Sequence, residues 1–346
     1  VASVGLGQGG QYLGVHPGVV VGRESPLVGV VQSGHPDILP GAVQPVMPLV
    51  AAMTGWLAER GWTVCVHERR PSLRGEGYGI AIHNNMARIF AAFGILDRVL
   101  AGGMRIDRRD SLDLDGRVVM TRKTTRSPYR IDRQHIIALL AERALATGVE
   151  IRFNSTVASA DPQGALTLAG GERRAADLVV AADGINSGIR DQFGLLKRRI
   201  LGRDCGARIN IPRRPDEIAA DSSEGTVMIE AWADKRRVLY CPVTRNEFYV
   251  LLTCTVQDKS AAVSPIDPDV WARSFPFMRA LFVRMRDEAD WPQSHWAHFA
   301  TIHLKRWSEG RIAVLGDVHG NLAALEAVLR DLRAAALGGL YALAPV

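Results

Sequence analysis

Leu178-Val-Val-Ala-Ala-Asp-Gly-Ile-Asn-Ser-Gly-Ile-Arg190 is the stretch of sequence that decides the fold. An apolar run of strand length ends at the turn pair Asp183-Gly184, and Ser187 and Arg190 follow at a spacing that suits the first turn of a helix. This order is typical of the ligand-binding edge of an α/β sheet, because backbone N–H groups at a helix start favour a phosphate. An ordinary turn between a strand and a helix has the same pattern, so the rest of the chain must decide between the two interpretations.

The length and composition indicate a packed protein with room for two domains. The chain has 346 residues, of which 47% are hydrophobic, an ordinary share for a globular protein. Its four cysteines are scattered without a Cys-x-x-Cys pair, so the sequence indicates neither a zinc site nor a disulfide framework. This cysteine usage predicts a reducing cytoplasm.

The positive charge is spread along the chain rather than gathered in one block. The net charge is +6 and the pI about 9.4, with arginines distributed between residues 60 and 310. Such a distribution suits anionic small molecules, and no basic run interleaved with aromatic residues favours a nucleic-acid partner. No stretch reaches the roughly 18 apolar residues of a membrane span, and the start shows no secretory signal. We therefore expect a small-molecule ligand, with no nucleic acid and no membrane.

A second strand-end carboxylate lies upstream. The periodicity predicts a helix over 49–60 that ends at Gly61, followed by a strand over 62–67 and then by Glu68. Helix, glycine, strand and acidic residue form the second half of a dinucleotide-binding βαβ unit, in which the carboxylate accepts hydrogen bonds from an adenosine ribose. A solvent-facing Glu at a strand end is the alternative interpretation.

The first half of that unit is missing from the sequence pattern. A strand and a Gly-x-Gly-x-x-Gly turn should precede the helix, but the corresponding segment Pro45-Val-Met-Pro-Leu-Val50 has no glycine and two prolines. Residues 1–50 are an atypical segment rich in Gly, Val and Pro. Their Gly5-Leu-Gly-Gln-Gly-Gly10 cluster follows no clear strand, which favours a flexible terminus over a phosphate-binding loop.

Two further motifs extend the pattern downstream. Arg130-Ile-Asp-Arg133 opens a periodic helix that runs to Thr147, and the guanidinium of Arg133 could fork onto phosphate oxygens or face solvent. Gly310-Arg-Ile-Ala-Val-Leu-Gly316-Asp317 predicts a turn, a buried strand and a second glycine-acid turn. Asp317 is thus a third strand-end carboxylate.

The segment between these motifs differs in character. Long strands are predicted over 225–232, 237–243 and 247–255, followed by helical patches over 269–274 and 278–286. We expect an α+β substrate-binding sheet over 201–304, inserted into an α/β domain made of 51–200 and 305–346. The histidines His295, His298 and His303 lie near one strand, but no carboxylate pattern supports them as ligands, so no metal site is predicted.

Between residues 50 and 317 the chain resembles the class A FAD-dependent monooxygenases of the para-hydroxybenzoate hydroxylase type. The resemblance implies a Rossmann-like FAD-binding domain with an inserted β-sheet substrate domain. It rests on four motifs in order: Leu57-Ala-Glu-Arg-Gly-Trp-Thr-Val-Cys-Val-His-Glu68-Arg69, Arg130-Ile-Asp-Arg133, Ala182-Asp183-Gly184-Ile-Asn-Ser187-Gly-Ile-Arg190 and Trp307-Ser-Glu-Gly-Arg-Ile-Ala-Val-Leu-Gly316-Asp317.

The resemblance also implies roles for these residues. Glu68, with Arg69 beside it, would hold the adenosine ribose, and Arg133 the phosphate region of FAD. The turn Asp183-Gly184 would lie at the pyrophosphate region that is shared with the reduced nicotinamide, and Gly316-Asp317 at the ribityl chain.

The implied reaction is the hydroxylation of a small aromatic compound with NAD(P)H and oxygen, through a flavin hydroperoxide, so that the cofactor carries the difficult chemistry. One catalytic base remains to be placed. Tyr240 and His83 are the candidates, because they lie in or next to strands that should line the pocket.

Both ends of the chain depart from the family pattern, and each departure supports an alternative. The glycine-free segment 45–50 favours a non-catalytic relative that has lost FAD. At the other end, Asp317-Val-His319 resembles the opening of a calcineurin-like metallophosphoesterase. The tail before Val346 has no room for the remaining ligands, and one Asp-x-His cannot build a two-metal site.

Overall fold

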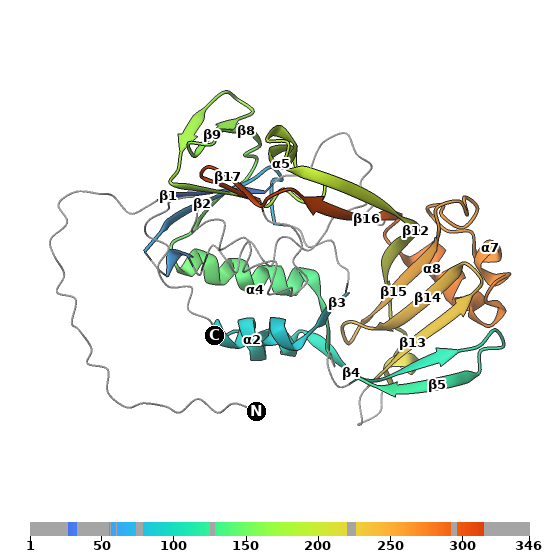
Figure 1. Ribbon diagram of the computed structural model, residues 1–346. Helices are drawn as coiled ribbons and strands as arrows, with labels where there is room; N and C mark the ends of the chain where they lie inside the picture. The colour runs from blue at the N-terminus through green and yellow to red at the C-terminus, as the bar shows by residue number, and fades with distance from the viewer. Residues whose placement is uncertain are drawn as a thin grey trace, which may run out of the picture.

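The computed structural model describes residues 27–32, 55, 57–59, 61–73, 79–124, 129–219, 226–291 and 296–314. Their strands form a smaller, mostly parallel sheet, a larger mixed sheet and a three-stranded sheet. Figure 1 shows the smaller sheet and the larger sheet in different parts of the molecule, joined by the long strands β12 and β16.

The smaller sheet has the strand order of a dinucleotide-binding fold. Its strands pair in parallel, except for the edge strand β17. Numbered along the chain, the parallel strands follow the order 3-2-1-4-5, the doubly wound arrangement. This confirms the predicted α/β class and the Rossmann-like domain. From one edge to the other the strands are β17 (Ser308–Glu309), β18 (Ile312–Val314), β11 (Leu178–Ala181), β1 (Leu27–Gln32), β2 (Thr63–Glu68) and β7 (Glu150–Arg152).

The strand that the sequence pattern lacks is present in the structure. β1 lies at the centre of the sheet and pairs with β2 on one side and β11 on the other. The prediction that the first strand is missing was therefore wrong, because Leu27–Gln32 fills its place about twenty residues upstream of the expected position. The sequence after β1, Ser33-Gly34-His35-Pro36, still lacks a Gly-x-Gly-x-x-Gly turn. The glycine-free segment 45–50 lies outside the described residues.

Strand β11 lies inside the smaller sheet, between β18 and β1, and it is apolar on both faces. Leu178, Val180 and Ala182 pack in one cluster with Ala144 of helix α4, and Val179 and Ala181 pack in another on the opposite face. Burial of each large aliphatic side chain contributes about 1.5–3 kcal/mol. The second face is covered by α5 (Gly188–Gln192) and by the three-stranded sheet β8 (Val157–Ala160), β9 (Ala165–Leu168) and β10 (Arg173–Ala175).

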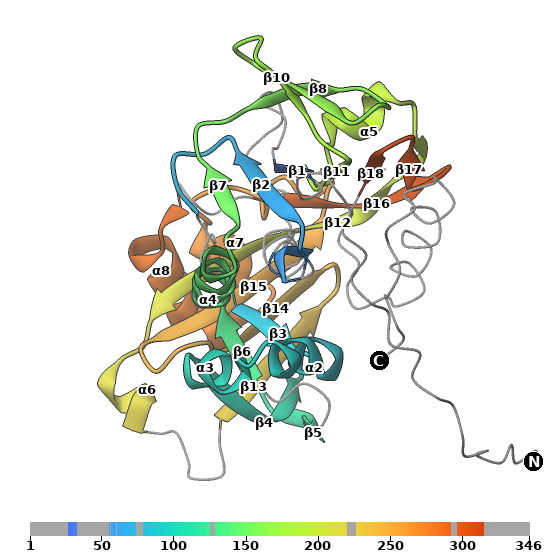
Figure 2. The same cartoon turned by 90° about the vertical axis from the view of Figure 1, so that its left-hand side faces the viewer.

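Helix α4 (Arg133–Ala146) connects the two parts of the structure. Its far end packs against the smaller sheet through Ala144, while Ile136, Leu139 and Leu140 pack with the helices α2 (Asn84–Ala92) and α3 (Leu96–Ala101). Figure 2 shows α4 nearly end-on beneath β2 and β7. The helix begins at Arg133, directly after β6, so its first turn lies next to a strand of the larger sheet.

The larger sheet contains the predicted substrate-domain strands together with strands that come before them in the chain. Strands β3 to β6 belong to it although they fall within 51–200, and β12 crosses residue 200. The division into domains therefore stays a prediction. In spatial order the strands are β16 (Ala297–Leu304), β12 (Leu196–Pro212), β15 (Glu247–Thr255), β14 (Arg236–Pro242), β13 (Thr226–Ala233), β4 (Gly103–Leu112), β6 (Tyr129–Asp132) and β3 (Gly79–Ile82), and β5 (Val118–Lys123) pairs with β4.

The two faces of this sheet differ. One face packs Ala207, Ile209 and Val250 against α7 (Pro268–Ala272), η1 (Pro276–Met278) and α8 (Arg279–Glu288), with α6 (Pro215–Ala219) near the end of β12. The opposite face carries Leu239, Cys241, Tyr249 and Leu251 among others. We call this second face the inner face.

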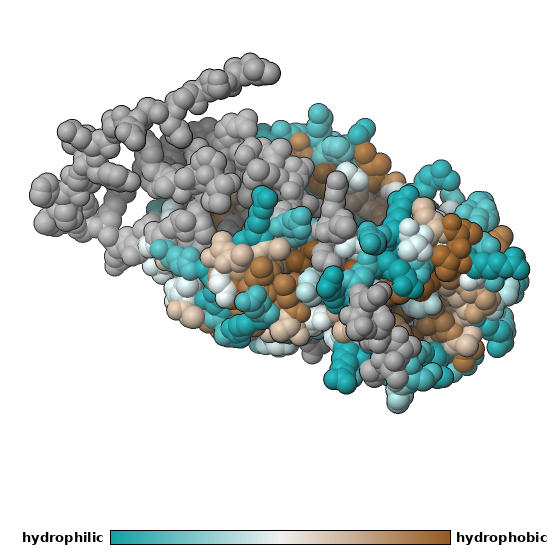
Figure 3. Space-filling model, turned by 90° about the horizontal axis from the view of Figure 1, so that it is seen from below, coloured by the Kyte–Doolittle hydropathy of each residue, from teal (hydrophilic) through white to brown (hydrophobic). Residues whose placement is uncertain are grey.

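The far edge of the sheet is open to solvent. All six residues of β5 are exposed, including Val118 and Val119 at 54% and 64%. The view from below shows hydrophobic patches among hydrophilic residues at the end of the molecule that carries the larger sheet (Figure 3). No helix in the described part of the chain is long and apolar enough to cross a membrane.

Candidate functional site

The carboxyl ends of β2, β1 and β11 meet at one edge of the smaller sheet. Gln32 at the end of β1 is opposite Glu68 at the end of β2, and Val31 is opposite Ala181, two residues before Asp183. Glu68 and Asp183 therefore flank β1 from its two sides. This is the position where the strand order reverses, and in open α/β sheets the crevice at that position binds nucleotides.

Glu68 is held in place at the end of its strand. Its side chain is only 5% exposed, and Oε1 accepts a hydrogen bond from the backbone N–H of Arg70 at 2.9 Å. Burial raises the pKa of the Glu68 carboxyl above its usual value. Arg69 follows it half-buried. A buried carboxylate at this edge can accept hydrogen bonds from hydroxyl groups of a ribose.

Asp183 organises the turn after β11. Its Oδ2 accepts a hydrogen bond from the N–H of Ile189 at 3.3 Å, while the Ser187 hydroxyl accepts one from the N–H of Arg190 at 3.0 Å. Ser187 thereby caps α5. Gly184 has a φ of 88°, which suits glycine.

The second carboxylate oxygen of Asp183 is buried. Asp183 is 5% exposed, and its Oδ1 has no hydrogen-bond partner among the residues that the structure describes. Burial is the main cause that raises the pKa of this carboxyl. Oδ1 of Asn186, in the same turn, is also buried without a described partner. Buried polar atoms are normally paired, so this turn fits a bound group that supplies hydrogen-bond donors.

Arg133 lies at the start of α4, next to the larger sheet. It is 6% exposed at the first position of α4, and its positive charge acts on Tyr249 of β15. The predicted site thus has two parts, the nucleotide edge with Glu68 and Asp183, and Arg133 beside the inner face.

The inner face combines an apolar wall with a group of polar side chains. Residues 205–211 alternate, so that Cys205, Ala207, Ile209 and Ile211 face the helices while Gly206, Arg208 and Asn210 face inward. Burial raises the pKa of the Tyr249 phenol, and a hydrogen bond from Arg208 opposes that shift. Asn210 Oδ1 and Thr253 Oγ1 are buried without a partner in the described part of the molecule. This face is therefore equipped to bind a polar ligand.

The approach of β3 to this wall requires glycine. A Cβ atom at Gly79 would lie 2.9 Å from Cγ2 of Val243 and 3.3 Å from the side chain of Tyr249. Gly79 is opposite Asp132 in the neighbouring strand β6, so the close contact brings the start of α4 next to Tyr249.

The two candidates for the catalytic base lie elsewhere. Tyr240 belongs to the helix-covered face, where its ring meets Phe248 edge-on at 6.0 Å. His83 is exposed at the N-cap position of α2 and makes no side-chain capping bond there. Neither contacts Asp183 or Tyr249 in any described hydrogen bond. Tyr249 and Arg208, which the structure places on the inner face, were missed in the sequence, although the alternation over 204–211 is a signal for Arg208.

The remaining predicted residues lie partly beyond the described chain. Gly316 and Asp317, and with them His319 and the phosphoesterase-like tail, follow the last described residue of β18. Nε2 of His298 donates a hydrogen bond to the backbone carbonyl oxygen of Gly202 at 2.7 Å. The residues that the structure describes contain no group of three or more potential metal ligands.

The buried Glu68 carboxyl leads to a prediction about pH. Because its pKa is raised in the folded state, Glu68 contributes stability below the unfolded-state pKa of about 4.3, and this contribution is lost as the pH rises through the folded-state value. The melting temperature of the unmodified apoprotein minus that of the Glu68→Gln variant should therefore be highest at acidic pH and should fall toward neutrality.

The matched control is Glu142→Gln. Glu142 is exposed and paired with Arg98 at 2.7 Å, which lowers its pKa, so the sign is reversed and its small contribution is lost as the pH falls. Thermal melts of the three proteins across the acidic range test this. If the melting temperature of the unmodified protein rose with pH relative to that of Glu68→Gln, the raised pKa of the buried Glu68 carboxyl would be contradicted.

Comparison with known proteins adds a family match. Residues 49–320 match the FAD binding domain family. The matched range includes Asp317 and His319, and none of the comparisons supports the phosphoesterase interpretation of that pair.

Individual relatives and one solved structure extend this match. The chain is 32% identical to 2-heptyl-3-hydroxy-4(1H)-quinolone synthase of Mycobacteroides abscessus, over 83% of this chain and 75% of that protein. It is 26% identical to 6-hydroxynicotinate 3-monooxygenase of Bordetella bronchiseptica, over 75% and 71%. The solved structure of 2-methyl-3-hydroxypyridine-5-carboxylic acid oxygenase, a tetrameric form, superposes with a TM-score of 0.73 at 28% identity, covering 92% of this chain and 84% of that one.

Proposed function

The chain belongs to the FAD binding domain family of flavin-dependent aromatic monooxygenases, and on this premise we propose that it hydroxylates a small nitrogen-containing aromatic ring that carries an acidic or hydroxyl oxygen. The observation that carries the choice of substrate is Arg208 beside Tyr249 on the inner face, flanked by buried polar atoms without described partners. The relatives' names support the ring type, since they refer to a quinolone, a hydroxynicotinate and a hydroxypyridine carboxylate.

The nucleotide edge is proposed to hold FAD. Glu68 would accept hydrogen bonds from the adenosine ribose, and Oδ1 of Asp183 would accept a hydrogen bond from the cofactor or from the reduced nicotinamide. We propose Arg133 for the phosphate region, and Gly316-Asp317 for the ribityl chain. When bound, FAD supplies electron transfer from NAD(P)H and the activation of oxygen.

The inner face is proposed to bind the substrate. Arg208 would pair with the anionic oxygen of the ring, and Asn210 and Thr253 would complete its hydrogen bonds. Leu239, Cys241 and Leu251 form the apolar part of the wall and would exclude water from the ring. Charge on the substrate and a dry wall are both needed, because an electron-rich ring reacts best as an oxyanion in a site from which bulk water is excluded.

Tyr249 replaces Tyr240 as the tyrosine proposed to meet the substrate. Burial keeps the pKa of Tyr249 above its usual value, so its phenol stays protonated at neutral pH and can donate a hydrogen bond to a substrate oxygen. It would thus position the ring and hold a proton near the reacting carbon, rather than act as a base. His83 stays a candidate for the catalytic base.

Turnover of a small panel of ring compounds tests this function. The full chain, reconstituted with FAD, is offered NADH or NADPH together with 6-hydroxynicotinate, a hydroxypyridine carboxylate, a 4-quinolone, or unsubstituted pyridine as the uncharged control. We expect one or more acidic heteroaromatics to stimulate NAD(P)H oxidation and to gain one oxygen atom from isotopically labelled oxygen gas. A product whose new oxygen atom comes from water rather than from the labelled gas would overturn the proposal. Equal stimulation by pyridine would also overturn it.

A further inference from the structure

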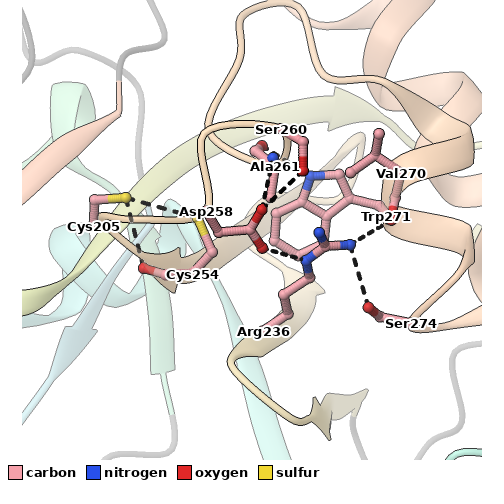
Figure 4. Close-up of polar contacts among 9 residues, drawn as sticks. All are labelled: Cys205, Arg236, Cys254, Asp258, Ser260, Ala261, Val270, Trp271 and Ser274. Carbon is pink, nitrogen blue, oxygen red and sulfur yellow. Dashed lines mark hydrogen bonds and ion pairs between the residues drawn. The ribbon is translucent and has the colours of Figure 1, made fainter.

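Two of the four cysteines, separated by 49 positions in the sequence, lie side by side in the larger sheet. Cys205 in β12 is directly opposite Cys254 in β15 in the antiparallel pairing. Their Sγ atoms are 3.7 Å apart, and the residues are 6% and 0% exposed. Figure 4 shows the two sulfur atoms pointing toward one another. Both are free thiols in the structure.

Their geometry is close to that of a disulfide. Residues directly opposite in antiparallel strands have Cβ atoms about 4.5–5.5 Å apart, and a disulfide needs about 3.5–4.5 Å. An S–S bond is about 2.05 Å long, so each sulfur has to move by less than about 1 Å from the observed 3.7 Å. Small side-chain rotations supply this without a change of strand register.

The surroundings favour a thiolate at this pair. Arg236 is opposite Cys254 in β14 and is held by Asp258 at 2.8 Å and by Ser274 at 3.2 Å (Figure 4). The hydrogen bond between the two sulfurs, in which either thiol can donate, is the main cause that lowers the pKa of Cys205, and Lys259 lowers it further. The lowered pKa makes Cys205 the better nucleophile of the two.

A cavity lies near the pair, and neither cysteine is among its lining residues. The cavity has a volume of 430 Å³ and is lined by Arg236, Thr255, Asp258 and Ser274 among others. Thr255 follows Cys254 in the chain, and Arg236 is its partner in register. The cavity is lined by polar side chains, so it admits water and molecules of similar size to within one residue of Cys254.

We propose that Cys205 and Cys254 form an oxidative modification site that closes to a reversible disulfide with hydrogen peroxide. The Cys205 thiolate attacks one peroxide oxygen, which breaks the O–O bond, releases hydroxide and gives a sulfenic acid. The Cys254 thiol then attacks the oxidised sulfur, the S–S bond forms and water leaves. In sum, two thiols and one hydrogen peroxide give one disulfide and two waters, so that peroxide is reduced and the two sulfurs are oxidised.

The disulfide would tie β12 to β15 immediately before the segment that carries Arg208. The bond joins the strands at Cys205, and the inner-face residues Gly206 and Arg208 follow it. The modification is independent of the bound cofactor and of the substrate. The disulfide can therefore fail to form while the proposed hydroxylation holds. Equally, the hydroxylation can fail while the disulfide forms.

Mass spectrometry of the full chain tests the site. After treatment with a modest excess of hydrogen peroxide and removal of the oxidant, we expect the intact mass to fall by two hydrogen atoms and the titratable thiols in denaturant to fall from four to two. A peptide digest should contain Cys205 linked to Cys254, and dithiothreitol should restore all four thiols.

Single variants separate this pair from the other cysteines. Cys254→Ser should stop at a sulfenic acid that a dimedone probe traps on Cys205, whereas Cys65→Ser, which removes the half-exposed cysteine of β2, should still lose two thiols. Linkage of Cys65 or Cys241 in the digest, addition of oxygen atoms without loss of hydrogen in the unmodified chain, or retention of all four thiols would each overturn the proposal.

Discussion

Replacing Asp183 by alanine is expected to yield a protein that purifies without flavin and binds added FAD at least tenfold more weakly than the unmodified chain. The side chain accepts a hydrogen bond from the N–H of Ile189 with one oxygen, and its other oxygen is buried without a described partner. Alanine removes both, and an unsatisfied buried donor costs about 1–3 kcal/mol. Flavin fluorescence titration and the visible spectrum of the purified variant measure the effect.

Asp183→Asn is the matched control for this prediction. Asparagine keeps the size and one acceptor for Ile189 but removes the charge. Because burial raises the pKa of Asp183, its ionised form costs folding free energy at neutral pH. The apoprotein of Asp183→Asn should therefore melt at the same or a higher temperature while binding FAD less well. Full flavin occupancy in Asp183→Ala would mean that the cofactor lies elsewhere.

Replacing Arg208 by methionine is expected to lower kcat/KM for an acidic ring substrate by about 100-fold, which corresponds to the loss of one charge-assisted hydrogen bond of about 2–3 kcal/mol. Most of the loss should come from a higher KM, because Arg208 is proposed to bind the substrate oxygen. Tyr249 also loses the hydrogen bond from Arg208. Steady-state kinetics with each substrate of the panel measures the change.

Arg198→Met provides the control on the same strand. Arg198 is exposed on β12, near the end that lies beside the smaller sheet, and its loss should leave kcat/KM within about twofold. Flavin content should be unchanged in both variants, which separates a substrate effect from cofactor loss. Unaltered kinetics in flavin-loaded Arg208→Met would remove Arg208 from the substrate site.

The nucleotide edge could be predicted from sequence because its signals are local. The strand, turn and cap around Asp183 lie within thirteen consecutive residues, and Glu68 follows its strand directly. The unbroken apolar run Leu178–Ala181 was enough to predict a strand, and the structure shows that this strand is buried on both faces. The family motifs then supplied the order in which the local units combine.

The central strand β1 was not predictable in the same way. Leu27–Gln32 lies in a segment without clear periodicity, and its assignment depends on pairing with two strands that are far away in the sequence, β2 and β11. Strand β12 was missed for another reason. Its first half carries Lys197, Arg198 and Arg199, which are exposed on a two-stranded ribbon with β16 and hide the alternation that begins at Asp204.

The faces on which Tyr240 and Tyr249 lie were not predictable from sequence. Both tyrosines lie in adjacent strands of the larger sheet, and side chains alternate between faces along each strand. Tyr240 is opposite Val250, which packs under the helices, while Tyr249 is opposite Cys241 on the inner face. The sequence predicted the strands correctly but did not say which face the helices α7 and α8 would cover.

FAD binding is tested most directly by a titration of the purified full chain with FAD, followed by flavin fluorescence and by the visible spectrum after removal of free cofactor. We expect one flavin bound per chain, with visible absorption bands that NAD(P)H bleaches, although no Gly-x-Gly-x-x-Gly turn follows β1. A colourless protein that leaves the fluorescence of added FAD unchanged would contradict this expectation and would favour a relative that has kept the fold but lost the cofactor.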